Sequence, residues 1–226
     1  VQPCGQDHHL ADAGPHRGVE KVVEVVGAHG LVVARHLVQP TAVFVVGDDF
    51  RHIAVNQYYP ELGHGQHELS VLPRPALAAA DTQVLVRETI RGVAARCGLV
   101  ASLAPKPWPD QAGNGAHVHF SAWQDERNVF HDPTGRYGLS ARAEQFAAGI
   151  LYHAAEICAV TDQYVNSYKR LWGGNEAPSY ICWGHNNRSA LVRVPMYKPN
   201  KGQSSRVEYR ALDSAANPYL AYALML

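Results

Sequence analysis

Two short segments of this chain alternate polar and apolar residues with a period of two, which is the pattern of half-buried β-strands. They are residues 117–121 (His-Val-His-Phe-Ser) and residues 206–210 (Arg-Val-Glu-Tyr-Arg). Successive side chains of a strand point to opposite faces, so each segment has a polar face and an apolar face. We therefore expect a sheet whose core side takes the apolar residues, namely Val118, Phe120, Val207 and Tyr209.

The composition is that of a globular protein of one large or two small domains. Of 226 residues, 46% are hydrophobic and 18% are charged, which argues against disorder. The formal net charge of zero offers no electrostatic case for nucleic acid or an anionic membrane as a partner. No apolar run approaches the roughly 20 residues that span a bilayer, and no signal peptide is visible.

Cysteine usage indicates a reducing compartment. The cysteines at positions 4, 97, 158 and 182 are far apart and form no Cys-x-x-Cys pair. This spacing favours free thiols over a disulfide framework or a zinc site. We therefore expect a cytoplasmic protein.

The chain divides into two parts of different character. Residues 1–52 are rich in Val, His and Gly; strands are expected over 22–26 and 31–46, with a break at 27–30. Residues 53–226 carry clearer signals, and the fold class expected is α+β, with a curved, mostly antiparallel sheet backed by helices. Its expected elements are a turn at 58–66, strands at 68–71, 99–103, 190–194 and 205–210, and helices at 76–96, 141–160 and 219–226.

Several polar groups could carry chemistry, and each also has a plain structural interpretation. Glu61 and Glu68 could bind one divalent cation or be two solvated acids. His117 and His119 share a strand face and could be metal ligands or an ordinary polar face. Glu176, in a Gly-rich loop, could close over a site and take a proton, or be an exposed loop acid.

The Arg206-x-Glu208-x-Arg210 pattern gives the most specific signal. It could be a salt-bridged surface, or it could give Glu208 to a metal and the guanidiniums to phosphate or carboxylate groups. Further arginines at 170, 188 and 193 favour a phosphoryl-transfer site that uses ATP. Walker, dinucleotide-binding, zinc-protease and serine-hydrolase motifs are absent from the sequence.

Taken together and in order, these motifs resemble the glutamine synthetase family. The matching segments are 61–68 (Glu-Leu-Gly-His-Gly-Gln-His-Glu), 114–121 (Asn-Gly-Ala-His-Val-His-Phe-Ser), 165–170 (Val-Asn-Ser-Tyr-Lys-Arg), 174–178 (Gly-Asn-Glu-Ala-Pro), 187–190 (Asn-Arg-Ser-Ala), 206–210 (Arg-Val-Glu-Tyr-Arg) and 216–220 (Ala-Asn-Pro-Tyr-Leu). The resemblance covers residues 53–226, a partial catalytic domain, and leaves residues 1–52 unassigned.

The resemblance implies a role for each matching residue. Metal ligands would be Glu61, Glu68, His117 and Glu208; ATP contacts would be His119, Ser121, Arg193 and Arg206; glutamate contacts would be Gly115, Arg170 and Arg210; catalytic residues would be Glu176 and Arg188. The implied cofactors are two Mg²⁺ or Mn²⁺ ions, with ATP as co-substrate. The implied partners are ATP, glutamate, ammonia or another amine, and further copies of the chain in a homo-oligomer.

The implied reaction is ATP-dependent ligation of ammonia to the γ-carboxylate of glutamate through γ-glutamyl phosphate. Two departures from the family leave alternatives open. The family's Glu-x-Glu strand, which gives one ligand to each metal, is not visible in residues 1–52. Each metal site would then lack one ligand, as in an inactive truncated remnant that binds nucleotide or assembles with intact subunits. In addition, Ala112 stands where the family has Asn, and relatives that ligate polyamines or other amines to glutamate share this general pattern.

Overall fold

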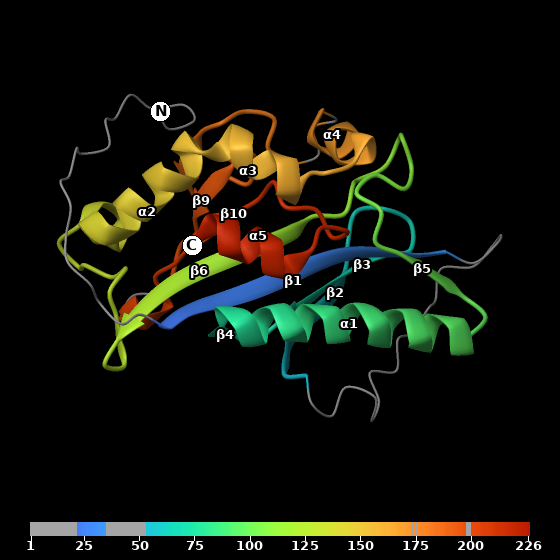
Figure 1. Ribbon diagram of the computed structural model, residues 1–226, viewed down its shortest axis with the longest axis horizontal. Helices are drawn as coiled ribbons and strands as arrows, with labels where there is room; N and C mark the ends of the chain where they lie inside the picture. Colours follow the sequence, from blue (N-terminus) through green and yellow to red (C-terminus); the bar gives the residue numbers. More distant parts are fainter. Residues whose placement is uncertain (1–21, 35–52, 173, 175, 198–199) are drawn as a thin grey trace.

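The structure, a computed structural model, describes the backbone of residues 22–34 and all atoms of residues 53–172, 174, 176–197 and 200–226 (Figure 1). Its strands are β1 (Val22–Ala34), β2 (Val55–Pro60), β3 (Gln66–Val71), β4 (Arg74–Pro75), β5 (Val100–Ser102), β6 (Ala116–Gln124), β7 (Arg127–Asn128), β8 (Trp183–His185), β9 (Val192–Val194) and β10 (Val207–Tyr209). Its helices are α1 (Ala76–Arg96), α2 (Ala141–Tyr152), α3 (Ala154–Thr161), α4 (Val165–Trp172) and α5 (Pro218–Met225), with 3₁₀ turns η2 (Arg136–Gly138) and η3 (Gly202–Ser204).

The described strands form one sheet in the order β2-β3-β1-β6-β10-β9-β8. β4 and β5 pair with β1, and β7 pairs with β6. Among the described strand pairs, β8 and β9 run parallel, and the others are antiparallel. The α+β fold with a mostly antiparallel sheet backed by helices, predicted from the sequence, is confirmed.

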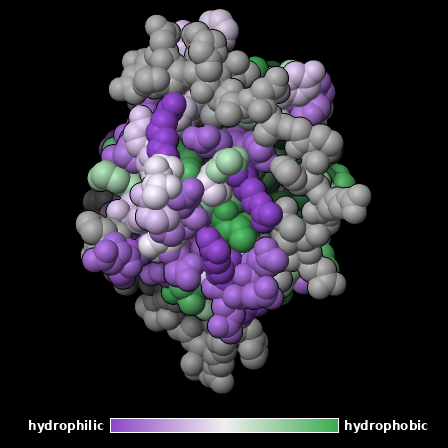
Figure 2. Space-filling view, turned by 90° about the vertical axis from the view of Figure 1, so that its left-hand side faces the viewer, coloured by the Kyte–Doolittle hydropathy of each residue, from purple (hydrophilic) through white to green (hydrophobic). Residues whose placement is uncertain are grey.

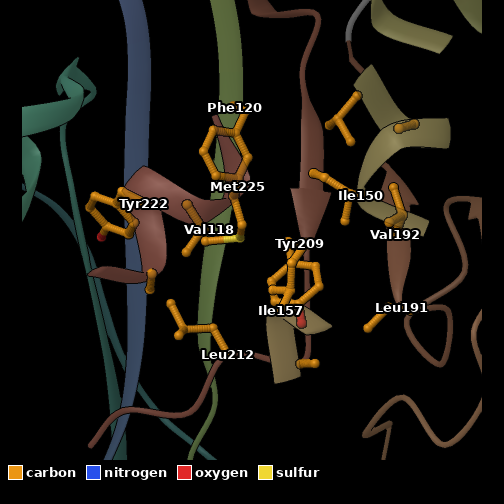
Figure 3. Packing of buried hydrophobic residues seen from close by; sticks show 14 of the residues in the cluster. Val118, Phe120, Ile150, Ile157, Leu191, Val192, Tyr209, Leu212, Tyr222 and Met225 are labelled. Carbon is orange, nitrogen blue, oxygen red and sulfur yellow. The ribbon is translucent and has the colours of Figure 1, made fainter. Parts of the chain in front are cut away.

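The two alternating segments place their side chains as predicted. In β6, Val118 and Phe120 are fully buried, and Val207 and Tyr209 of β10 are fully buried beside them. Helices α2, α3 and α5 lie over this face of the sheet (Figures 1 and 3). The imidazoles of β6 therefore occupy the opposite face, which the helices leave open.

A second, smaller apolar cluster holds α1 against the sheet. Val86 and Ile90 of the helix pack with Leu69 and Val71 of β3 and with Leu103 after β5. The bounds of α1 agree with the sequence prediction, and Gly98 just beyond it has a φ of +67°, which suits a glycine at a helix end. Because β3 carries Glu68, this packing also fixes one side of the site described below.

Two sequence predictions about secondary structure in residues 53–226 are wrong. The turn expected at 58–66 begins later, because residues 55–60 form the exposed edge strand β2, which lacks the apolar alternation of a half-buried strand. The helix expected at 141–160 is two helices that break at His153, although the buried stripe of Ile150, Ala154 and Ile157 continues through the break. Periodicity alone cannot detect such a break.

The N-terminal prediction is also corrected. The break expected at 27–30 is absent, because β1 runs without interruption from Val22 to Ala34 and pairs on both sides, with β3 and with β6. Pairing on two edges holds glycines in extended backbone that their intrinsic preference does not favour. The remainder of the strand expected at 31–46 lies outside the described residues.

The cysteine prediction holds only in part. Cys97 and Cys158 are free thiols, whereas Cys182 is disulfide-bonded, which contradicts the expectation of free thiols throughout. Sequence spacing does not report the distance in space on which a disulfide depends.

Within the described residues, none of the helices combines the length and apolar character that crossing a bilayer requires. Hydrophilic residues dominate the end of the molecule shown in Figure 2.

Candidate active site

A polar hollow lies on the open face of the sheet and collects residues from distant parts of the sequence. All of the predicted site residues line it except Ser121 and Arg206. Strands β3, β6, β9 and β10 supply its floor, α4 supplies one wall, and the loops after α4 and β8 supply the rim. The predicted residues in the lining are Glu61, Glu68, Gly115, His117, His119, Arg170, Glu176, Arg188, Arg193, Glu208 and Arg210.

Glu208 is the buried centre of this hollow. Its carboxylate is 1% exposed and accepts hydrogen bonds from Arg193 Nε and from Arg210 Nη1, the latter at 2.6 Å. His117 Nδ1 lies 3.4 Å from the same carboxylate. Burial by itself would raise the pKa of Glu208, but His119, His117 and the two guanidiniums outweigh it and lower the pKa to about 2. Glu208 is therefore an anion at any physiological pH.

The two imidazoles beside Glu208 are neutral. Burial lowers the pKa of His117 well below its ordinary value, and burial lowers the pKa of His119 to about 4. Arg206 Nε donates to His119 Nδ1 at 3.2 Å, which requires an unprotonated nitrogen there. Neutral imidazoles keep a lone pair that can accept a hydrogen bond or bind a metal.

The carboxylate on β3 has the opposite environment. Burial, together with the neighbouring Glu61, raises the pKa of Glu68 to about 7, although a hydrogen bond from Tyr59 opposes the shift. Tyr59 lies directly opposite Glu68 in the pairing of β2 with β3. Glu61 and Glu68 thus form an acidic pair that a cation would stabilise.

Arg170 enters the hollow from α4 and is 3% exposed. Its Nη2 donates to Arg210 O at 2.8 Å, and its Nη1 donates to Ala211 O. A Cβ at Gly115 would lie 2.6 Å from Arg170 Nη2 and 2.8 Å from His117 Nε2, so a larger residue there would displace one of these two side chains. The predicted substrate-loop glycine therefore sits where backbone and guanidinium approach closely.

Glu176 and Arg188 form an exposed pair at the rim. Arg188 Nη1 lies 3.3 Å from Glu176 Oε2, and this hydrogen bond raises the pKa of Arg188. Arg210 Nη2 donates to the backbone oxygen of Glu176 at 3.3 Å, so the loop reaches the hollow. Positions 173 and 175 of this Gly-rich loop lie outside the described residues.

Ser121 and Arg206 lie beside the hollow rather than in its lining. Ser121 Oγ accepts from Trp123 Nε1 at 2.9 Å, and Arg206 bonds to His119 and to Ser204 O. Conversely, the lining includes Tyr59 and Gln66, which the sequence reasoning did not single out. Gln66 is buried and donates to Gly113 O and Asn114 Oδ1, both at 2.9 Å. A glutamine between two candidate acids was the signal that could have indicated it.

The described residues do not make a complete metal centre. Their carboxylates and neutral imidazoles are chemically suited to Mg²⁺ or Mn²⁺. However, no group of three or more His, Cys, Asp or Glu residues in the described part of the chain is placed to hold an ion. Glu61 and Glu68 stand alone on one side, and Glu208 on the other side is already bound by two guanidiniums.

Strand β1 separates these two halves of the donor set. Its position 28 pairs with His117 on one side and with Ser70 on the other, and position 30 pairs with Glu68. Directly paired positions of an antiparallel sheet share a face, so positions 28 and 30 belong to the face of the site. They carry Ala and Gly, neither of which offers a ligand atom.

A sheet face that combines guanidiniums, carboxylates and neutral imidazoles is chemically suited to ligands that carry phosphate or carboxylate groups. The sequence profile described as "Glutamine synthetase, catalytic domain" matches residues 47–226. The chain therefore belongs to the glutamine synthetase family.

Named relatives agree with this assignment. The chain is 48% identical to "Glutamine synthetase" of Mycolicibacterium smegmatis over 174 residues, which cover 77% of this chain and 39% of that protein. It is 48% identical to "Glutamine synthetase" of Thermococcus kodakarensis over 166 residues, 74% of this chain and 36% of that protein. The matched region thus spans less than half the length of these relatives.

Solved structures share the fold. A "novel glutamine synthase homolog" superposes with a TM-score of 0.77 at 29% identity, covering 90% of this chain and 53% of that one. The Plasmodium falciparum glutamine synthetase superposes with a TM-score of 0.78 over 89% of this chain and 50% of that one, and at 21% identity it supports the fold alone.

Proposed function

We propose that residues 53–226 form part of a catalytic domain that ligates ammonia to the γ-carboxylate of glutamate at the expense of ATP. The observation that carries this proposal is the position of Arg170 and Arg210 side by side in the hollow, with Arg188, Arg193 and Glu176 also in its lining. Paired guanidiniums suit the carboxylate of an amino acid, and further guanidiniums suit a phosphoryl group.

Each residue has a specific task in this proposal. Arg170 and Arg210, with the Gly115 backbone, hold glutamate; Arg193, Arg206, His119 and Ser121 hold the nucleotide. A γ-carboxylate oxygen attacks the γ-phosphorus of ATP, the bond to ADP breaks, and γ-glutamyl phosphate forms. Arg188 stabilises the charge on the transferring group.

The second step exchanges phosphate for nitrogen. Glu176 accepts a proton from the incoming ammonium, the nitrogen attacks the acyl carbon, and phosphate leaves with its bonding electrons. The backbone of Glu176 is already within reach of Arg210, so closure of this loop would exclude water from the acyl phosphate. No step is assigned to a metal, because the described residues do not complete a metal centre.

One observation favours a second candidate, a chain that binds its ligands without turnover. Among the described residues, neither the Glu61–Glu68 pair nor Glu208 belongs to a group of three metal-binding side chains, and positions 28 and 30 between them offer no ligand atom. Such a chain would act by holding nucleotide or by assembling with intact subunits. A homo-oligomer and a cytoplasmic location remain part of the proposal and rest on the family relationship alone.

Phosphate release from ATP tests the proposal. With Mg²⁺, glutamate and ATP present, we expect release that depends on ammonium and exceeds release with putrescine or ethanolamine; the reverse order would make the chain a γ-glutamyl-amine ligase. The Arg170→Gln variant should lose glutamate-dependent release. Arg91→Gln, which alters an exposed arginine paired with Glu88, is the matched control.

Calorimetry separates the remaining outcomes. Binding of glutamate and a non-hydrolysable ATP analogue without phosphate release would support the second candidate. Absence of both binding and release would contradict both candidates.

A further inference from the structure

Helix α4 is held to the molecule mainly by polar contacts. Its fully buried side chains are Ser167 and Arg170, which are three residues apart and so lie on one face of the helix. Val165, Tyr168 and Trp172 on its other faces are exposed, and Leu171 is only partly buried against the core. Asn166 also exchanges two hydrogen bonds with the backbone of Lys106. The position of this helix, and of the Arg170 guanidinium, therefore depends on that contact and on what Ser167 and Arg170 bond to.

Both side chains bond to one short segment after β10. Ser167 Oγ donates to Asp213 Oδ2 at 2.5 Å, while the Arg170 guanidinium donates to the carbonyl oxygens of Arg210 and Ala211. Asp213 is fully buried, and its second carboxylate oxygen accepts from Ala215 N at 2.9 Å. The same segment thus carries Arg210 and accepts the hydrogen bonds of Arg170. These are the two arginines that the proposed function assigns to the carboxylate ligand.

The backbone of Asp213 joins two further parts of the site. Its N–H donates to Thr161 O at the end of α3, at 3.3 Å, and Asp213 forms an isolated β-bridge with Gly115. Gly115 is the residue that lies between Arg170 and His117. Asp213 is consequently the point at which α3, α4 and the Gly115 loop meet.

The charges agree with this geometry. A buried guanidinium without a counter-charge is strongly unfavourable. Burial lowers the pKa of Arg170, and the carboxylates of Asp162 and Asp213 oppose that shift. Asp213 does not line the hollow; its backbone bridges to Gly115, and its side chain reaches Arg170 on α4 through Ser167.

We propose that Asp213 is the positioning residue for Arg170: through Ser167 it fixes α4, so that the guanidinium presents its free edge to a carboxylate in the hollow. The identity of that ligand rests on the proposed function, whereas the mechanical link between Asp213 and α4 does not.

The test compares Asp213→Ala, Asp213→Asn and Ser167→Ala with Ser214→Ala. Ser214 is the matched control, because it is equally buried, adjacent in sequence and donates to Leu103 O at 2.9 Å, with Asn114 O at 3.5 Å as a second acceptor. For the first three variants, we expect faster amide hydrogen exchange in residues 165–172 and unchanged exchange in α5. Ser214→Ala should leave exchange in α4 unchanged.

Ligand affinity distinguishes a positioning role from a general loss of stability, because a general loss would weaken the binding of both ligands. The dissociation constant for L-glutamate should rise about tenfold or more in Asp213→Ala, the scale of one lost charged hydrogen bond, and less in Asp213→Asn, which keeps the shape and an acceptor. The constant for a non-hydrolysable ATP analogue should stay within about twofold. Equal losses for both ligands, or wild-type glutamate affinity with unchanged α4 exchange, would overturn the proposal.

The experiment also remains decisive if the wild type binds no glutamate or if the Asp213→Ala variant does not fold. If the wild type binds no glutamate, the proposed function fails, and hydrogen exchange in α4 alone decides whether Asp213 positions the helix. If Asp213→Ala does not fold, Asp213→Asn and Ser167→Ala decide in its place.

Discussion

Two carboxylates, the buried Glu208 on β10 and the partly buried Glu68 on β3, lie on the same face of the same sheet and have opposite electrostatic environments. Glu208 is bound by Arg193 and Arg210, and its pKa falls to about 2. Glu68 is partly buried beside another acid, Glu61, and its pKa rises to about 7. Burial raises the pKa of both groups, so the difference comes from their neighbours.

The hollow therefore has two halves with different charge balance. Arginines neutralise the carboxylate in the Glu208 half, whereas a bound cation would stabilise the carboxylates in the Glu61–Glu68 half. Guanidiniums already balance Glu208, so its half can receive an anionic ligand through the arginines' remaining donors. The Glu61–Glu68 half carries excess negative charge that no described cation neutralises at contact distance.

Removal of the Glu208 charge should have the largest effect. Glu208→Gln leaves two buried guanidiniums without an anion, which we expect to lower the free energy of unfolding by about 3–5 kcal/mol at pH 7.5. Urea unfolding measures this loss. Glu61→Gln, on the uncompensated half, should change stability by under about 1 kcal/mol or increase it. Equal losses in the two variants would abolish the distinction between the halves.

The Glu68 carboxyl should make the free energy of unfolding fall as the pH rises. This is opposite to the direction expected for Glu208, because the pKa of Glu208 is lowered and that of Glu68 is raised. Its folded-state pKa of about 7 exceeds the ordinary value of 4.5, so the folded protein binds the proton more tightly than the unfolded chain does. The stability gained from this is complete below pH 4.5 and is lost as the pH rises through 7.

Glu68→Gln removes this titration while keeping the shape of the side chain. Relative to wild type, the variant should therefore gain up to about 3 kcal/mol between pH 4 and pH 8. Urea unfolding at pH 4, 6 and 8 measures the difference. A constant difference across this range would mean that Glu68 titrates normally.

Local pattern predicted the strands that matter most but not their order. The alternation in residues 117–121 and 206–210 reports burial on one face directly, so Phe120 and Tyr209 were placed in the core correctly. Edge strand β2 was missed because five of its six residues are exposed. Helix α4 was missed because its inner face is a serine and an arginine, which give no apolar stripe.

The convergence of site residues was predicted from ordered motifs rather than from local structure. No local signal indicates that Glu68 and Glu208 share a face across three intervening strand pairings. Tyr59 and Asp213 were not predicted from the sequence, because the role of each depends on a partner elsewhere in the chain. Tyr59 pairs with Glu68 across a hairpin, and Asp213 bonds to Ser167, 46 residues away. Such roles need three-dimensional contacts.

Substitutions in strand β1 offer the most direct way to add metal ligands between the Glu61–Glu68 half and the Glu208 half of the hollow. Positions 28 and 30 belong to the site face between the two halves, beside His117 and Glu68 respectively. A carboxylate at each position would give each half a further oxygen ligand for a divalent cation. We therefore expect Ala28→Glu/Gly30→Glu to bind Mn²⁺ at least about tenfold more tightly than wild type, a gain of about 1.4 kcal/mol.

Electron paramagnetic resonance of free Mn²⁺ measures this affinity without reference to catalysis. The matched control is Ala28→Gln/Gly30→Gln, which adds the same bulk but no charge and should bind Mn²⁺ as weakly as wild type. Adding Glu61→Gln to the carboxylate variant should remove much of the gain, because that half would again lack a ligand. If the Glu and Gln pairs bind Mn²⁺ equally, positions 28 and 30 do not face the Glu61–Glu68 pair, and the separation of the donor set by β1 is not what limits metal binding.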